Sequence, residues 1–299
     1  MQASLLELLT SPHFADAEPG LSEAALVALE EALGATLPAA ARELYRHCGG
    51  IANRVRTALP MRLMPPTDVV DTLQILSDCM DVYHPHPAAR YLFTDDNSNW
   101  VGIFVEGPLC GKLTILDHDL GSNAPRFVDL ASFLKKLVAA ADRSDPWEQM
   151  SSDYPLTAAS AGALIDEVAP LAAHYLAAYH AVQDPRTRNV AADIALHLTD
   201  PRQGDTVNAM LASPSPFARH VALQIVAVHQ RIEWAPLLEA YGYAAIKQND
   251  YGAWTNAVKA FAALGATPAV DALVLAAPAN WPAPDGTRDL RPTDLTDEV

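Results

Sequence analysis

Strand-like alternation of apolar and polar side chains is strongest in one region of this chain, between residues 90 and 118. Three segments there show the period of two that is typical of a half-buried strand: RYLFT (90–94), NWVGIFVE (99–106) and KLTILDH (112–118). The joining segments, DDNSN (95–99) and GPLCG (107–111), are rich in residues that favour turns. The pattern therefore predicts an antiparallel meander.

The two faces of this predicted sheet differ in character. One face is aliphatic (Val101, Ile103 and Val105), and the other is aromatic (Trp100 and Phe104, with Tyr91 and Phe93 expected alongside). The aliphatic face suits a covering layer of helices. The aromatic face needs a second cover or a partner.

Helical periodicity surrounds the meander. A helix is predicted over 22–33, with Ser22 as its N-cap and Gly34 as its end, and a second helix over 38–48 ends at a double glycine. Further elements are expected as a short helix at 4–10, a strand near Met61–Met64, a helix over 68–77 and a closing helix over 129–141, capped by Asp129. Together these elements make residues 1–141 an α+β domain, an antiparallel sheet backed by helices.

The pattern changes after a linker-like segment at 142–155, because no strand signal follows it. Residues 184–201 and 215–230 align at a spacing of 31, with Arg188 matching Arg219, and 251–268 form a weaker third copy. Periodic helix pairs that bury small residues are typical of an α-solenoid. Residues 156–277 therefore resemble degenerate HEAT-like repeats, and 278–299 are expected to be a loosely attached tail.

Charge and cysteine usage exclude several classes of protein. The net charge is −16, and it is spread over the chain: residues 1–150 hold 20 acidic and 11 basic side chains, and residues 151–299 hold 16 and 9. Such a field repels nucleic acid and anionic membranes and attracts basic partners. The three cysteines show no disulfide or zinc spacing. With no signal-like N-terminus and no run of about 18 apolar residues, we expect a cytoplasmic protein.

Two clusters carry side chains that could do chemistry. In YHPHP (83–87) two histidines at i, i+2 would share a strand face and could bind a metal, but the prolines favour a surface loop. Asp117-His118-Asp119 fits either a base with its orienting group or a strand end whose carboxylates bind local backbone. GxGxxG, Walker A, GxSxG and HExxH motifs are absent. We therefore expect no enzyme and assign no catalytic, cofactor-binding or metal-binding residue.

Three segments in order resemble the SUKH superfamily: the helix–LGATLP–helix–GG run (22–50), FTDDNSNWVGIF (93–104) and LTILDHDLGSNAPRFVDLASFLKKL (113–137). The resemblance covers roughly residues 1–140. It implies an α+β domain whose twisted antiparallel sheet is backed by helices. It also implies a function that is usually not catalytic. Bacterial members are mostly immunity proteins that bind and neutralise toxins, many of them nucleases or nucleic-acid deaminases, whereas fungal members act as regulatory scaffolds.

The leading expectation is a cytoplasmic immunity protein that binds a basic cognate toxin, with no direct contact to nucleic acid or membrane. The contacts are expected from acids at the turn edge of the meander and one aromatic side chain: Asp95, Asp96, Asp117, Asp119 and Trp100. The alternatives are a regulatory scaffold, or an enzyme that uses the Asp117-His118 pair. The concave surface of the HEAT-like repeats is the rival binding site.

Overall fold

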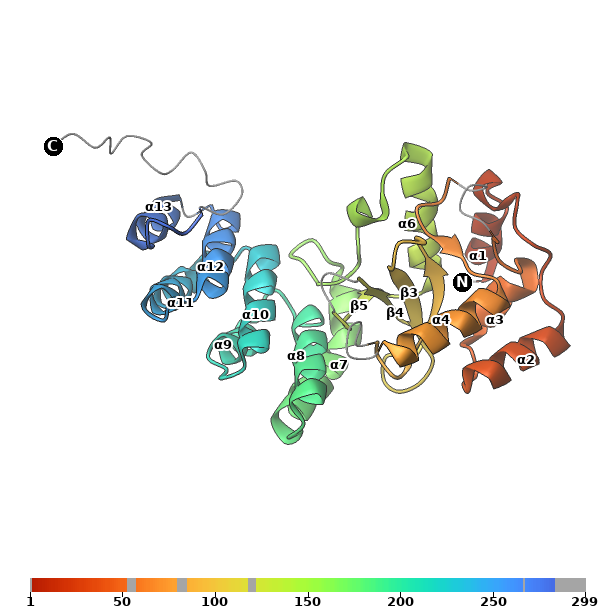
Figure 1. Cartoon of the computed structure of the whole chain (residues 1–299), viewed down its shortest axis with the longest axis horizontal. Coiled ribbons are helices and arrows are strands. Elements are labelled where there is room, and N and C mark those ends of the chain that lie inside the picture. The colour runs from red at the N-terminus through yellow and green to blue at the C-terminus, as the bar shows by residue number, and fades with distance from the viewer. Residues whose placement is uncertain (1, 53–57, 80–84, 118–121, 266, 283–299) are drawn as a thin grey trace. The chain divides into compact units, whose positions relative to one another are not determined.

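The computed structural model describes residues 2–52, 58–79, 85–117, 122–265 and 267–282. The chain divides into two compact units, Met1–Tyr154 and Pro155–Val299. In Figure 1 the strands and the helices α1 to α6 belong to the first unit, and the helices from α7 onward belong to the second.

The first unit contains the predicted antiparallel sheet. Its five strands are β1 (Arg62–Leu63), β2 (Ala89–Thr94), β3 (Trp100–Phe104), β4 (Leu113–Leu116) and β5 (Pro125–Phe127). The strands follow one another in the sheet in their chain order, and every neighbouring pair is antiparallel. The α+β character of this part of the chain is thereby confirmed.

A bulge in β2 changes which residues share a face. Tyr91 pairs with Gly102, but Phe93 pairs with Val101, so Leu92 is an extra residue in β2. Residues directly opposite each other in an antiparallel pair project to the same side. Phe93 therefore lies on the aliphatic face with Val101, and the expectation that it joins the aromatic face is wrong.

Helices pack around this sheet. They are α1 (Gln2–Leu9), α2 (Glu23–Leu33), α3 (Ala39–His47), α4 (Pro66–Asp78) and α6 (Leu130–Arg143), with 3-10 turns η1 (Pro12–Phe14) and η3 (Trp147–Gln149). Two caps form as predicted, since Ser22 accepts a hydrogen bond from the Ala25 amide and Asp129 accepts one from the Ser132 amide. Phe133 of α6 contacts the ring of Phe93, so α6 covers the aliphatic face.

The double glycine after α3 lies where three segments of the chain meet. Gly49 donates its amide hydrogen to the carbonyl of Glu18, and Glu18 donates its own to the carbonyl of Gly50. Gly50 has φ +118°, and a Cβ there would lie 2.5 Å from the backbone nitrogen of Pro65. No other residue fits this crossing without moving backbone. The double glycine thus lets the chain after α3 pack directly against the segment before α2 and against Pro65, at the start of α4.

Residues 142–154 of the segment that was expected to be a linker belong to the first unit, and Pro155 begins the second. Asp153 accepts hydrogen bonds from the amide of Val128 (2.9 Å) and the hydroxyl of Ser132 (2.7 Å), and it pairs with Lys136. Tyr154 is fully buried. These contacts tie the segment to β5 and α6.

The helices and 3-10 turns are the only regular secondary structure in the described residues of the second unit. Its helices are α7 (Gly162–Ala181), α8 (Pro185–His197), α9 (Asp205–Leu211), α10 (Pro216–His229), α11 (Ala235–Lys247), α12 (Tyr251–Ala263) and α13 (Thr267–Ala276), with a 3-10 turn η4 (Ile232–Trp234). Helix α10 packs against both α8 and α12. Asp184 caps α8 and Ser215 caps α10, each followed by proline. The equivalence of these helices as HEAT-like repeats stays a prediction.

Part of the expected tail is attached to this unit. Trp281 is buried against the rings of Trp254 and Tyr251, and Tyr251 donates its hydroxyl hydrogen to the carbonyl of Pro282. Residues 278–282 therefore cover the N-terminal part of α12. The remainder of the predicted tail, 283–299, lies outside the described residues.

Candidate functional site

The turn between β2 and β3 is built by Asp95. Its buried carboxylate accepts hydrogen bonds from the amides of Asn97 (2.7 Å) and Asn99 (3.1 Å) and from the side-chain amide of Asn99 (2.7 Å). An aspartate that holds its own turn in this way is common in tight turns. Asp95 therefore shapes the turn from inside, whereas the side chain of the next residue, Asp96, is about one-third exposed, at 35%.

Asp96 faces a buried arginine. Both oxygens of Asp96 accept hydrogen bonds from Arg62, at 2.8 to 3.0 Å. The same guanidinium donates to a carboxylate oxygen of Asp68 (2.9 Å) and to the carbonyl of Ile51 (2.8 Å). Burial disfavours the charged form of Arg62, but the bonds to Asp96 and Asp68 outweigh it and raise its pKa. The guanidinium thus holds two carboxylates in fixed positions.

These groups line an open hollow of about 310 Å³, which we call the Arg62 hollow. The sheet and its turn contribute Arg62, Met64, Thr94, Asp96, Ser98 and Trp100, and α4 contributes Asp68, Asp71, Thr72 and Ile75. Arg62 pairs with Thr94, which pairs with Trp100, so these three residues share one face of the sheet. The four residues of α4 follow the spacing i, i+3, i+4, i+7, which places them on one side of the helix.

The rim of the hollow is acidic and partly apolar. Three carboxylates (Asp68, Asp71 and Asp96) stand against one guanidinium among the lining residues. Ile75 is half exposed at 50%, although a large aliphatic side chain favours burial. Trp100 also lines the hollow, with only 8% of its surface exposed. An acidic rim beside exposed apolar surface is a composition suited to binding a basic protein surface.

The structure separates the five site residues predicted from the sequence. Asp96 and Trp100 lie together in the Arg62 hollow. Asp95 is buried in the turn. Asp117 follows Leu116, the partner of Trp100 in β4, and is therefore at the same end of the sheet. Asp119 lies outside the described residues.

Sequence reasoning missed the contribution of α4. The run PTDVVDTLQILSD forms α4 and places Asp68, Asp71 and Ile75 on one side of the helix. Their spacing in the sequence, together with the predicted helix, could have indicated that they share a face. Arg62 carried no comparable signal. An arginine in a short strand is usually exposed, and its role depends on Asp96, which is 34 residues away.

Of the two histidine-containing clusters in the sequence, 83–87 and 117–119, the structure describes the histidine side chain only at His86. His86 donates its backbone amide hydrogen to the hydroxyl of Tyr91, and its ring contacts Phe104 edge-on. Burial lowers the pKa of His86 to about 4, so the imidazole is neutral at pH 7. His84, His118 and Asp119 lie outside the described residues. Within the part of the chain that the structure describes, no three His, Cys, Asp or Glu side chains are arranged to hold a metal ion.

Comparison with known proteins gives no assignment. No protein-family model matches the chain, and no curated protein matches its sequence. In the ranges that the structure describes, no helix has the length and apolar character needed to cross a bilayer.

Proposed function

We propose that this protein is a non-catalytic cytoplasmic immunity protein that binds and neutralises a basic cognate toxin. The single observation that carries the proposal is the Arg62 hollow. There Asp68 and Asp96 bind one buried guanidinium, and Asp71 and the partly exposed Ile75 line the same hollow. The resemblance of residues 1–140 to the SUKH superfamily supports the same function, because bacterial members of that family are mostly immunity proteins.

The proposal has a physical rationale in the surface that a toxin of this kind presents. A nuclease or nucleic-acid deaminase needs a positively charged groove to hold phosphates. Carboxylates that are already fixed in space can enter such a groove with little loss of side-chain entropy. Asp68 and Asp96 are fixed by their bonds to Arg62, while Asp71 stands exposed on the neighbouring turn of α4. The net charge of −16 adds long-range attraction that accelerates association.

The alternative proposal is a regulatory scaffold, in which the second unit is a HEAT-like solenoid that holds other proteins. One observation favours it. Large apolar side chains are exposed on the helices of this unit, with Ile232 at 60%, Leu237 at 46% and Leu275 at 64%. Exposed apolar side chains can mark surfaces that bind other proteins when they form a contiguous patch.

The test uses the intact chain and the product of the gene adjacent to its own. We expect the two proteins to bind and the chain to protect cells that produce the toxin.

Asp71→Lys should lower the association rate on the order of 10-fold and weaken its salt dependence, because the substitution reverses a charge that steers the partner. Surface plasmon resonance at two salt concentrations measures both effects.

Glu148→Lys is the matched control, since Glu148 is exposed in η3 and the change in charge is the same. If both variants behave alike, the Arg62 hollow is not the binding site. If no product of an adjacent gene binds the intact chain, the immunity function is wrong and the scaffold replaces it.

A further inference from the structure

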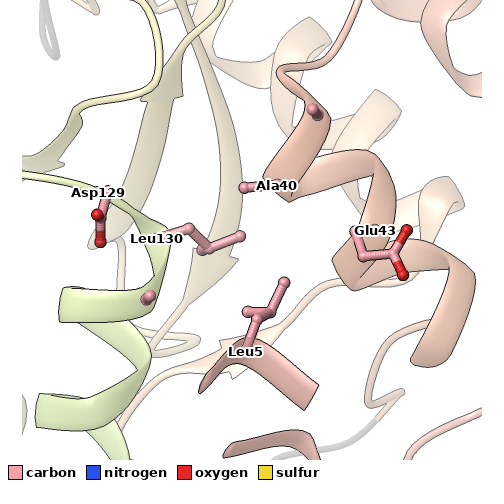
Figure 2. A pocket seen from close by; sticks show the side chains of 7 residues that line it. Leu5, Ala40, Glu43, Asp129 and Leu130 are labelled. Carbon is pink, nitrogen blue, oxygen red and sulfur yellow. The ribbon is translucent and has the colours of Figure 1, made fainter. Parts of the chain in front are cut away.

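A second pocket in the first unit shares no lining residue with the Arg62 hollow. It lies among α1, α3 and α6 and encloses about 220 Å³ (Figure 2). Its walls are aliphatic, formed by Leu5, Ala39, Ala40, Leu130 and Ala131. Figure 2 shows the side chains of Leu5, Ala40 and Leu130 directed into the same space.

Small side chains keep this pocket open. Helix α3 begins with three consecutive alanines, of which Ala41 is buried in the core while Ala39 and Ala40 border the pocket. Alanine is a strong helix former, but it fills little volume. At these two positions a longer aliphatic side chain would occupy the space. The pocket is therefore a consequence of residue size in α3, and it can be filled by substitution.

Two carboxylates stand on opposite sides of the pocket, Glu43 on α3 and Asp129 at the start of α6 (Figure 2). Hydrogen bonds from His47 and then Arg46 lower the pKa of Glu43, so this group is ionised at pH 7. One oxygen of Asp129 accepts the hydrogen bond that caps α6, at 2.8 Å from the Ser132 amide nitrogen. One oxygen of Glu43 pairs with Arg46 (3.1 Å) and the other with His47 (2.9 Å). The opening is thus apolar at its centre, with a carboxylate on each of two sides.

The size of the pocket decides what it can hold. Sites for drug-sized ligands and cofactors enclose about 300–1,000 Å³, whereas a cavity of about 150 Å³ accepts one benzene ring. A volume near 220 Å³ suits one large apolar side chain. Well-packed pockets that take a single anchor residue dominate the energetics of many protein interfaces.

We propose that this pocket receives one large apolar side chain of a partner protein, from a segment in which basic residues stand on both sides of the anchor. The apolar group fills the space between α1, α3 and α6. The flanking cations approach Glu43 and Asp129. The inference extends the proposed function, whose basic partner would supply such a segment, but its test does not require that partner.

The test is a titration of the full, isotopically labelled chain with the peptide acetyl-Lys-Phe-Lys-amide at low salt, followed by NMR. We expect saturable shifts of the amide signals of Ala40, Glu43 and Ala131. Acetyl-Lys-Gly-Lys-amide lacks the anchor, and acetyl-Glu-Phe-Glu-amide reverses the charges. Each should bind at least 10-fold more weakly. Equal binding of the Glu-Phe-Glu peptide would overturn the proposal.

Ala40→Leu should abolish peptide binding without lowering the melting temperature, because leucine fills the pocket and is tolerated in a helix. Ala131→Leu fills the pocket from the side of α6, and it replaces Ala40→Leu in the test if that variant is unstable. The control is Ala32→Leu, which adds the same side chain at an exposed position of α2. Unchanged binding by a folded pocket-filling variant contradicts the proposal, and so do shifts confined to the Arg62 hollow. Neither result bears on the Asp71→Lys experiment.

Discussion

At the scale of single residues, Arg62 determines the geometry of the candidate site. Only 8% of its surface is exposed, and its guanidinium donates to Asp96, Asp68 and the carbonyl of Ile51. A buried arginine is stable only when its donors are satisfied, since an unpaired buried charge is costly. Asp96 and Asp68 are each about one-third exposed, at 35%, so they can offer their remaining oxygen surface to a partner.

Replacing Arg62 by methionine should lower the free energy of unfolding by about 2 kcal/mol. Breaking a buried ion pair costs about 3–5 kcal/mol, and we reduce this figure because water can reach the two carboxylates left behind. Urea denaturation measures the change. Arg143→Met is the control, because Arg143 is an exposed partner of Asp145 and its loss should cost less than about 0.5 kcal/mol. Equal effects of the two substitutions would contradict the role given to Arg62.

At the scale of secondary-structure elements, the register between β2 and β3 determines which side chains share a face of the sheet. The bulge at Leu92 sends Phe93 to the face covered by α6 and leaves Tyr91 on the face of Trp100. The ring of Tyr91 lies across Gly102 on the neighbouring strand, where a Cβ would be 2.8 Å from a ring carbon. Glycine at this position lets the aromatic ring pack directly on the backbone.

Gly102→Ala should destabilise the first unit by about 2 kcal/mol, because the rigid ring of Tyr91 must move out of a filled space. The double variant with Tyr91→Leu should lose less than the sum of the single changes, since the clash is gone. Gly242→Ala is the comparison. Its Cβ would lie 2.7 and 2.9 Å from the two terminal carbons of Leu273 and 3.4 Å from its Cγ, and a leucine side chain can turn aside more readily than a tyrosine ring. Alanine also favours the helix by about 1 kcal/mol. Additive effects of Gly102→Ala and Tyr91→Leu would show that the close packing has no energetic consequence.

At the scale of the whole molecule, buried histidines connect stability to pH. His229 is 5% exposed and stacks on Trp234 at the end of α10. Burial lowers its pKa to about 4, while an unfolded histidine titrates near 6.5. Between these values the unfolded chain binds a proton that the native chain does not. Stability is therefore greatest above pH 6.5 and falls as the pH drops towards 4, with His86 acting in the same direction.

His229→Phe should remove this part of the pH dependence. Phenylalanine keeps a ring beside Trp234 but has no group that titrates, so the loss of unfolding free energy between pH 7 and pH 4 should shrink by about 3 kcal/mol. Urea denaturation at several pH values measures the slope. The control is His180→Phe, at an exposed position of α7, which should leave the slope nearly unchanged. A slope that His229→Phe does not alter would show that this histidine has the same pKa in the native and the unfolded chain.

Local signals in the chain were enough to predict most of its elements. Ser22, Asp129 and Gly34 mark helix ends through bonds or dihedral angles that involve only nearby residues, and the alternation of β3 is a property of the strand itself. The change from strands to helices at about residue 155 is equally local. These features follow from the sequence because their physics acts over a few residues.

Features that depend on distant residues were decided by the tertiary structure. Asp95 and Asp96 are identical neighbours in the sequence, yet one is buried in the turn and the other binds Arg62. The bulge at Leu92 placed Phe93 on the opposite face from the one expected. The Arg62 hollow and the α1–α3–α6 pocket each combine elements far apart in the chain. Periodicity reports which side of an element is apolar, but only the packing of the elements determines which side chains meet.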